Sequence, residues 1–183
     1  CYEAGITVTS LPGACACITA LTMSGQPTRR FAFEAFLPYD KKERTQILEN
    51  LRNETRTIII YEAPHHLKKT LKECREYLGN RNMTVCKELT KRYEQKRKST
   101  LDEMIAYYEK NEPRGEYVLI FEGKSLQELK EEKQQEWNQL TVQEHMEHYL
   151  EKGMDKKSAM KQVAKDRGVG KRDVYRELVE RNR

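Results

Sequence analysis

The run Thr57-Ile-Ile-Ile60 constrains the fold more than any other feature, because an uninterrupted β-branched run of this length is typical of a strand covered on both faces. The stretch that contains this run, Arg56–Tyr61, and two others, Phe31–Phe36 and Glu116–Phe121, are rich in β-branched and aromatic residues. Each is short enough to be a strand. Met83–Glu88 and Tyr93–Lys98 are predicted to be two further strands.

Segments typical of helices lie before and between these strands. Pro64 suits the first position of a helix, and Ser99 or Thr100 suits an N-cap. The predicted helices are Ala14–Met23, Lys41–Arg52, Pro64–Leu78 and Leu101–Lys110. Helices alternating with strands indicate an α/β fold, with a mixed sheet flanked by helices rather than a purely parallel one.

The beginning of the chain resembles the end of a helix. Cys1-Tyr-Glu-Ala-Gly5 is typical of a last helical turn closed by glycine, and Ile6–Thr9 is predicted to be a strand. No initiator methionine precedes them. We therefore expect the sequence to begin in the middle of a domain.

A change of composition follows Gly123. Residues 1–123 are expected to form the α/β domain, and the Lys-, Glu- and Gln-rich residues 124–139 a helical linker. Residues 140–183 are expected to form a small tri-helical, helix-turn-helix-like module. Its helices are marked by the capping box Thr141–Glu144, by Asp155–Arg167 closed by Gly168, and by Lys171–Glu180. The predicted apolar stripe comprises Ala159, Val163, Ala164, Val169, Val174, Tyr175 and Leu178.

The net charge of +5 is concentrated in this module. Residues 152–183 hold eleven Lys or Arg against five Asp or Glu, so residues 1–151 carry a charge of −1. A compact basic module favours a polyanionic partner such as RNA. A solvated helical face, or a bundle for dimerisation or capping, explains the charge equally well without RNA.

Cysteine usage and hydropathy exclude several classes of protein. The five cysteines have no paired metal spacing, and their odd number does not suit a complete disulfide framework. His145 and His148 share a helical face but have no evident third ligand, so no metal site is predicted. Without a run of about 20 apolar residues or an apolar leader, the chain is expected to be cytoplasmic.

Three junctions place polar or small residues where a strand gives way to a loop. Pro12 and Gly13 precede a helix, so its first amides could approach a ligand. The second junction runs from Tyr61 to His66, and the third from Cys86 to Lys91. Ligands of α/β sheets gather at the carboxyl ends of strands, but a turn, a helix cap or an ion-pair cluster would explain the same residues structurally.

Taken in order, five motifs resemble the small-subunit ribosomal RNA methyltransferase I family of the tetrapyrrole methylase superfamily. They are Leu-Pro-Gly-Ala-Cys-Ala-Cys-Ile-Thr-Ala-Leu (11–21), Phe-Glu-Ala-Phe-Leu-Pro (33–38), Ile-Tyr-Glu-Ala-Pro-His (60–65), Lys-Glu-Leu-Thr-Lys (87–91) and Arg-Gly-Glu-Tyr-Val-Leu-Ile-Phe-Glu-Gly (114–123). The resemblance covers nearly the whole chain. It implies methylation of a cytidine 2'-hydroxyl in 16S ribosomal RNA with S-adenosylmethionine, by a cytoplasmic homodimer.

Members of that family hold S-adenosylmethionine between two domains, so the resemblance implies that this chain supplies one wall and is inactive without the N-terminal domain. The cofactor wall implied by analogy comprises Pro12, Gly13, Ala16, Cys17, Tyr61, Glu62, Leu89, Thr90, Glu116, Tyr117 and Val118. Lys171, Arg172 and Arg176 are the expected RNA contacts. The family usually has Arg where this chain has His66, which removes a bidentate phosphate contact.

The chemistry implied is an in-line displacement, in which the ribose 2'-oxygen attacks the sulfonium methyl. Because a 2'-hydroxyl is a poor acid, a nearby base or cation would assist it, and Glu88 and Lys91 are the candidates. Two alternatives remain open. The chain could be a non-enzymatic RNA-binding or dimerisation fragment, or a tetrapyrrole methylase of the precorrin type.

Overall fold

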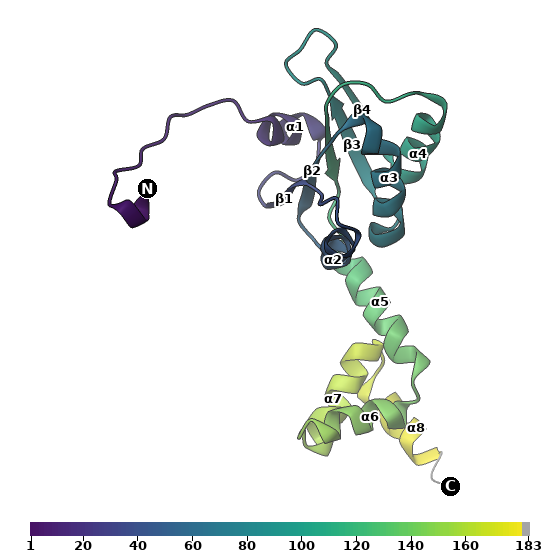
Figure 1. Cartoon of the computed structure of the whole chain (residues 1–183). Helices are drawn as coiled ribbons and strands as arrows, with labels where there is room; N and C mark the ends of the chain where they lie inside the picture. Colours follow the sequence, from purple (N-terminus) through teal and green to yellow (C-terminus); the bar gives the residue numbers. More distant parts are fainter. Residues whose placement is uncertain (181–183) are drawn as a thin grey trace. The chain divides into compact units, whose positions relative to one another are not determined.

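The computed structural model describes residues 1–180 and divides into two compact units, Cys1–Lys124 and Ser125–Arg183. The first unit contains a five-stranded sheet, and the described part of the second, residues 125–180, contains helices and no strand (Figure 1). The predicted α/β class with a mixed sheet is therefore confirmed.

The sheet has the order β1-β2-β5-β3-β4, with β1 parallel to β2 and every other neighbouring pair antiparallel. Its strands are β1 (Phe31–Phe36), β2 (Thr57–Glu62), β3 (Asn82–Lys87), β4 (Gln95–Thr100) and β5 (Tyr117–Phe121). All five predicted strands are present, each within two residues of its expected bounds. The last strand in sequence, β5, is central, and all its residues are buried, as its apolar sequence requires.

Four helices cover the two faces of this sheet: α1 (Ala16–Ser24), α2 (Lys41–Leu51), α3 (Pro64–Leu78) and α4 (Leu101–Lys110). The larger core lies on the side of α2, α3 and α4, and it includes Leu67, Leu71 and Cys74 of α3. Their spacing of three to four residues places them on one helical face. A smaller core lies under α1, around Ala20, Leu21 and Ile59.

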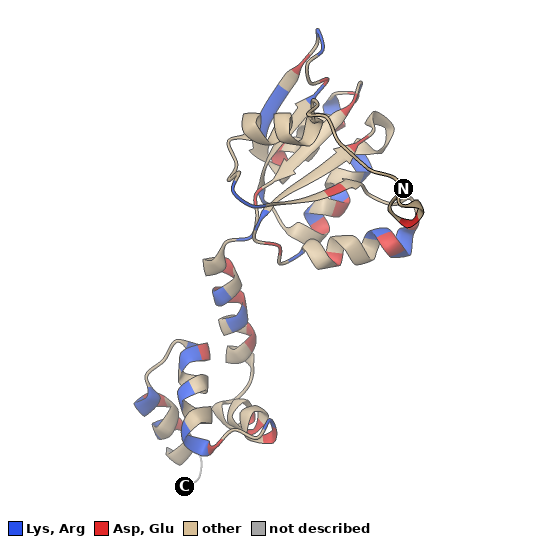
Figure 2. Cartoon of the chain, turned by 90° about the vertical axis from the view of Figure 1, so that its left-hand side faces the viewer, with Lys and Arg blue, Asp and Glu red and all other residues tan. Residues whose placement is uncertain are grey.

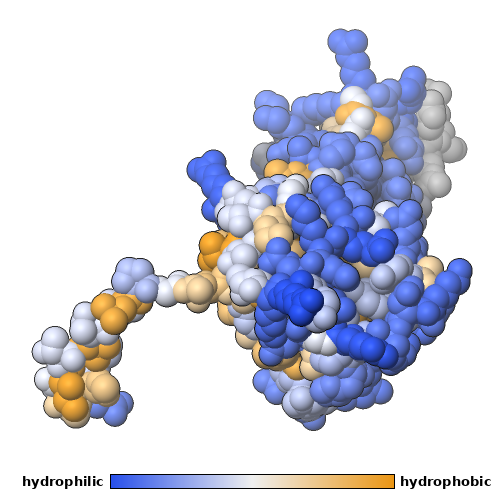
Figure 3. All heavy atoms as spheres, turned by 90° about the horizontal axis from the view of Figure 1, so that it is seen from above, coloured by the Kyte–Doolittle hydropathy of each residue, from blue (hydrophilic) through white to orange (hydrophobic). Residues whose placement is uncertain are grey.

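The predicted strand Ile6–Thr9 is wrong. A 3-10 turn, Tyr2–Ala4, does close on Gly5 in the left-handed conformation, but residues 6–15 form neither helix nor strand. No described strand pairs with residues 6–9, and Ile6 is 58% exposed. A strand needs a partner for its backbone groups, so this segment stays irregular despite its sequence. Figure 3 shows its apolar side chains at the surface.

The second unit comprises α5 (Leu126–Gln139), α6 (Val142–Glu151), α7 (Lys156–Arg167) and α8 (Lys171–Glu180). The Thr141 capping box, the Asp155 N-cap and the left-handed Gly168 all lie where the sequence predicts them. The core contains Val142, Met146, Ala159, Val163, Ala164 and Val174.

Two features of this unit differ from the sequence-based expectations. Val169 and Tyr175, expected in the apolar stripe, are 46% and 59% exposed. Val169 precedes α8, and within α8 Val174 and Leu178 are the stripe residues that reach the core. The helix expected as a linker, α5, packs against α7: the Gln134 side chain donates a hydrogen bond to the Arg167 carbonyl at 2.5 Å.

None of the helices within residues 1–180 is both long and apolar enough to span a membrane. Over the same part of the chain, no group of His, Cys, Asp and Glu side chains is arranged to hold a metal ion.

Candidate functional site

The carboxyl ends of β2 and β3 lie at the same end of the sheet, which we call the shared edge. Both strands are antiparallel to β5, so they run in the same direction on either side of it. Glu62 and Lys87, the last residues of the two strands, are both paired with Tyr117. The loops 61–66 and 86–91 therefore lie on either side of Tyr117. They follow the carboxyl ends of β2 and β3, and ligands of α/β sheets gather at such ends.

On the α1 side of this edge, four of the predicted cofactor residues belong to one apolar cluster. Cys17 of α1 and Val118 of β5 are buried there, with Tyr61 and Leu89 packed against them. Burial raises the pKa of both Cys17 and Tyr61. The cluster presents a largely apolar wall that also carries a thiol and a phenol.

Cys15 and Cys17 lie together at the start of α1, with their Sγ atoms 3.3 Å apart. Cys15 is exposed and Cys17 is buried. The hydrogen bond from Cys17 lowers the pKa of the Cys15 thiol. The two pKa values are thus shifted in opposite directions, although only Ala16 separates the two residues.

Glu62 faces the opposite side of the sheet, and its carboxylate is already occupied. Its side chain accepts hydrogen bonds from the Thr70 hydroxyl and from the Ala63 N–H, the latter at 2.8 Å. The Arg44 guanidinium lies 4.0 Å from the same carboxylate, and both side chains are at least nine-tenths buried. Glu62 therefore anchors the start of α3 against α2, and only its main chain is available for a ligand.

The loop after β3 is closed against the residue before β5. Glu88 and Glu116 are joined twice: the Glu88 N–H donates to the Glu116 carbonyl at 3.0 Å, and the Glu116 N–H donates to Glu88 Oε1 at 2.8 Å. Glu88 and Thr90 adopt positive φ angles of 50° and 62°. Such angles are uncommon outside glycine, so tertiary contacts hold this loop in an unusual conformation.

Lys91 bridges the two glutamates of this junction, with its Nζ atom 3.2 Å from Glu88 and 2.8 Å from Glu116. The backbone hydrogen bond from Glu116 and the contact with Lys91 lower the pKa of Glu88. The hydrogen bonds to Glu116 and Glu88 raise the pKa of Lys91. Both shifts favour the charged forms, so the pair offers a fixed ammonium group rather than a strong base.

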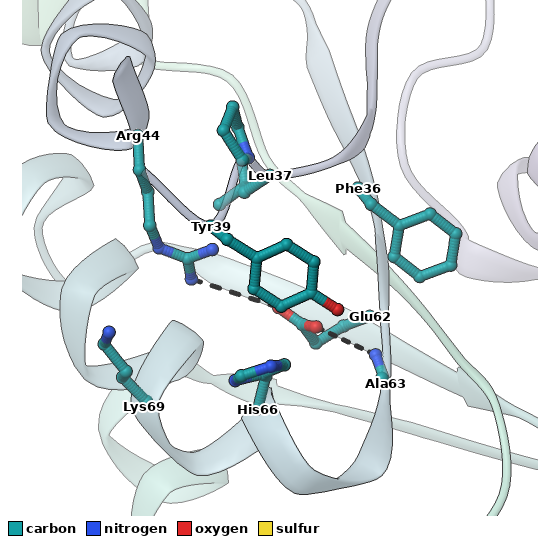
Figure 4. A pocket seen from close by; sticks show the side chains of 9 residues that line it. Phe36, Leu37, Tyr39, Arg44, Glu62, Ala63, His66 and Lys69 are labelled. Carbon is teal, nitrogen blue, oxygen red and sulfur yellow. Dashed lines mark hydrogen bonds and ion pairs between the residues drawn. The ribbon is translucent and has the colours of Figure 1, made fainter. Parts of the chain in front are cut away.

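A pocket of about 450 Å³ lies beside Glu62, where β1 and β2 end (Figure 4). Arg44, His66 and Lys69 bring positive or titratable nitrogen to it, and Phe36 and Tyr39 bring aromatic rings. Its full lining is Phe36, Leu37, Pro38, Tyr39, Arg44, Glu62, Ala63, His66 and Lys69. This combination suits a planar or anionic ligand.

Of the lining residues, the sequence assigned a site role to Glu62 alone and noted His66 as a departure from the family pattern. The others come from the end of β1 and the loop after it, from α2, and from the N-cap and first two turns of α3, so no single local motif contains them. The available signal was the Phe-Leu-Pro segment at 36–38, which ends a strand parallel to β2 and so reaches the same edge.

The remaining predicted cofactor residues are placed differently. Pro12 and Gly13 are exposed in the irregular segment, and a Cβ atom on Gly13 would meet nothing within 4 Å. Ala16 is exposed at the first turn of α1. The structure thus gathers Cys17, Tyr61, Leu89 and Val118 at the shared edge. It brings neither Pro12 nor Gly13 into contact with them.

The three cations proposed for RNA binding all lie on α8. Lys171 and Arg172 are exposed in its first turn. Arg176 is also exposed, but its guanidinium pairs with Asp173 at 2.6 Å. The first two are therefore freer to bind a phosphate than the third.

A model of the family "Tetrapyrrole (Corrin/Porphyrin) Methylases" matches residues 1–105. Two solved structures share the fold: the methyltransferase CobJ, with a TM-score of 0.52 and 16% identity over 67% of this chain and 53% of that one, and the cobalt precorrin-4 methyltransferase CbiF, with a TM-score of 0.50 and 17% identity over 66% and 54%.

Relatives with much higher sequence identity are named ribosomal RNA small subunit methyltransferase I. The protein from Halalkalibacterium halodurans is 46% identical over 93% of this chain and 58% of its own length. The Bacillus subtilis protein is 46% identical over 94% and 59%, and the Synechocystis protein is 39% identical over 96% and 61%. The chain therefore spans about three fifths of the length of these relatives.

Proposed function

The chain belongs to the tetrapyrrole methylase family, and from this premise we propose that it takes part in S-adenosylmethionine-dependent 2'-O-methylation of a cytidine in small-subunit ribosomal RNA. The observation that carries the proposal is the contrast in identity. Relatives named for ribosomal RNA methylation are 46% identical over more than nine-tenths of the chain, whereas the corrin-pathway methylase CbiF is 17% identical.

The residues at the shared edge fit one wall of a cofactor site. Cys17, Tyr61, Leu89 and Val118 form an apolar surface that suits the adenosyl and thioether parts of S-adenosylmethionine. Glu62 is engaged by its neighbours, so we assign it, with Tyr61, Thr90, Glu116 and Tyr117, to main-chain contacts. Bound there, the cofactor would supply an activated methyl group.

In this proposal the chain positions the ribose and favours loss of its proton. The Lys91 ammonium group, held between Glu88 and Glu116, would stabilise negative charge that develops on the 2'-oxygen. Glu88 orients Lys91 and fixes the loop. A carboxylate whose pKa is lowered is a weak base, so Glu88 would contribute more by position than by proton transfer.

The RNA would reach this edge from the side of the pocket next to Glu62. Lys69, His66 and Arg44 would hold a phosphate or the planar base, with Tyr39 and Phe36 beside them. His66 replaces the bidentate Arg of the family pattern, so a larger share of this task falls to Lys69. A ribosomal RNA substrate implies a cytoplasmic enzyme, and a homodimer is expected from family resemblance.

A segment exchange tests the proposal. The part of the Bacillus subtilis relative that matches this chain is replaced by it, and the chimera is expressed in a strain that lacks its own enzyme. We expect 2'-O-methylcytidine in small-subunit ribosomal RNA, detected by nucleoside mass spectrometry. The matched control carries Lys91→Met.

A folded chimera that binds S-adenosylmethionine but leaves ribosomal RNA unmodified would overturn the assignment of substrate. Methylation of a tetrapyrrole by the same chimera would replace it with the corrin-type alternative.

A further inference from the structure

The hairpin formed by β3, β4 and the loop between them carries a dense basic surface, and only its residues 88–91 belong to the predicted site. Residues 87–98, named here the basic hairpin, contain six Lys or Arg and two Glu. Residues 1–151 as a whole are slightly acidic, so this concentration is local. Figure 2 shows the cations in blue along β4 and the loop before it.

The two acids of the basic hairpin are engaged within it or beside it. Glu88 accepts the Glu116 N–H and pairs with Lys91. Glu94 accepts the Thr90 N–H at 2.7 Å. Within residues 1–180, five cations of the hairpin have no carboxylate within 4.0 Å: Lys87, Arg92, Lys96, Arg97 and Lys98.

Strand alternation distributes these cations over both faces of β4. Lys98 lies on the α1 face, where its Nζ atom comes within 3.4 Å of a Cβ atom built on Gly25. Arg97 points to the opposite face. Because β4 pairs only with β3, its outer edge is open, and a ligand that follows this edge meets cations on either side.

Arg97 and two tyrosines build a hollow on the α4 side. The guanidinium carbon of Arg97 lies 3.8 Å from the ring centroid of Tyr107, and that ring contacts Tyr108 edge-on at 5.0 Å. These side chains line a hollow of about 300 Å³ with Val85, Lys87, Gln95 and Lys96. Guanidinium and phenol planes are surfaces on which unpaired bases stack.

A further aromatic residue lies in the loop of the hairpin. Tyr93 is 66% exposed, with the Arg92 guanidinium 5.6 Å from its ring centroid. Cations interleaved with exposed aromatic rings favour single-stranded nucleic acid over a duplex, whose bases are stacked internally.

We propose that the basic hairpin binds single-stranded RNA, with its cations on the phosphates and an unstacked base against Arg97 and Tyr107. The surface begins at Lys87, which is paired with Tyr117 at the edge of the candidate site. RNA held along β4 therefore leads to that edge. This inference rests on the proposed RNA substrate and adds to it the segment that holds the strand.

The test compares two variants that remove the same charge. The hairpin variant carries Lys96→Gln, Arg97→Gln and Lys98→Gln, and the control carries Arg29→Gln, Arg30→Gln and Lys42→Gln. All six positions are exposed. Arg29 and Arg30 directly precede β1, so they lie at the end of that strand away from the pocket beside Glu62. The probe is a fluorescent single-stranded RNA of about 12 nucleotides, a length in the range of single-strand site sizes, whose anisotropy is followed as the salt concentration rises.

We expect the hairpin variant to bind at least about tenfold more weakly at moderate salt, and its plot of log affinity against log salt to be shallower by about 2 units, since each phosphate contact to a single strand contributes about 0.7. The control variant should retain most of the affinity and most of the slope. Arg97→Lys keeps the charge but loses the planar stack, so it should weaken binding and leave the slope nearly unchanged.

Circular dichroism and thermal unfolding of each variant establish that the sheet is intact. If the hairpin variant is folded and keeps the affinity and slope of the control, the proposal is wrong. Self-association of that variant with unchanged RNA binding would instead mean that the cations keep the open edge of β4 from pairing with another chain.

The methylation chimera separates this inference from the function on which it rests. Methylation with an unchanged KM in the hairpin variant would contradict the inference alone. RNA binding through the hairpin by a chimera that never methylates ribosomal RNA would contradict the proposed function alone.

Discussion

The indole of Trp137 stacks flat on the imidazole of His145, with ring centroids 3.8 Å apart and an interplanar angle of 4°. His145 is completely buried, and its Nδ1 atom accepts a hydrogen bond from the Arg167 Nε–H at 3.2 Å. Its Nε2 atom lies 3.4 Å from Asp166. A ring that accepts at one nitrogen inside a core is held in its neutral form.

Acidification should therefore destabilise the second unit. Burial and the neighbouring Arg167 lower the pKa of His145, so between its folded and unfolded pKa values the unfolded chain binds more protons. The stabilising contribution of the neutral ring is complete above the unfolded value of about 6.5 and declines as the pH falls below it. Trp137, the only tryptophan, reports this by fluorescence during urea titrations at several pH values.

His148 provides the control, because it lies in the same helix and meets Trp137 edge-on at 5.1 Å. His148→Gln should keep the pH dependence and His145→Gln should lose it. The prediction would be contradicted if the unsubstituted chain had the same free energy of unfolding above and below a pH of about 6.5.

Gly115→Ala should destabilise the first unit through a clash with Glu88. Gly115 has a φ of 81°, and a Cβ atom there would lie 2.5 Å from the Glu88 carboxylate. Gly79 has the same φ but open space around it, so Gly79→Ala measures a backbone cost without a clash, about 1–3 kcal/mol at its ψ of −173°. We expect urea unfolding to give a larger loss for Gly115→Ala, and equal losses would show that Glu88 moves aside freely.

Cys15 should be the most reactive thiol of its pair. The thiolate is the nucleophile, and the pKa of Cys15 is lowered whereas that of Cys17 is raised. Iodoacetamide labelling followed by peptide mass spectrometry should modify Cys15 first. Cys86, with a pKa raised to about 11, and Cys74, raised to about 12, should react last.

In the chimera, S-adenosylmethionine should slow labelling of both Cys15 and Cys17 if the α1 side of the edge is the cofactor wall. Labelling that is unaffected by a saturating concentration would place the cofactor elsewhere.

Replacement of Lys91 should lower the rate of methyl transfer more than it lowers cofactor affinity. Lys91→Met removes the ammonium group held by Glu88 and Glu116, and we expect about a hundredfold lower single-turnover rate in the chimera. Lys91→Arg should recover part of it. Glu88→Gln should have a smaller effect than Lys91→Met, and an unchanged rate in both variants would exclude them from the reaction.

The cations of α8 should contribute to RNA binding in a salt-dependent way. Lys171→Ala with Arg172→Ala should make the plot of log affinity against log salt shallower by about 1.4 units. Arg176→Ala should do less, because Asp173 already neutralises that guanidinium. Identical affinity of the double variant and the natural chain at low salt would limit α8 to packing.

Local signals predicted the helices well. Proline at its first position marked the helix Pro64–Leu78, as the structure has it. The N-cap expected at Ser99 or Thr100 and the Thr141 capping box mark the starts of α4 and α6 in the same way. Each signal lies within a few residues of the feature it predicts.

Features that depend on distant partners were beyond reach. Ile6–Thr9 has the composition of a strand but no pairing partner among residues 1–180, and the pocket beside Glu62 draws its lining from β1 and the loop after it, from α2, and from the junction of β2 with α3. Charge counted over long segments assigned the basic surplus to the C-terminal helices. It concealed the basic hairpin, because acidic residues elsewhere in 1–151 offset its six cations.

The central position of β5 also determines when the first unit can fold during synthesis. β2 and β3 do not pair with each other, because each of them pairs with β5, which lies between them. Until Tyr117–Phe121 leaves the ribosome, the chain can form only two separate two-stranded ribbons, and such ribbons are marginally stable in water. We therefore expect the sheet of the first unit to become stable only when β5 joins both ribbons at once.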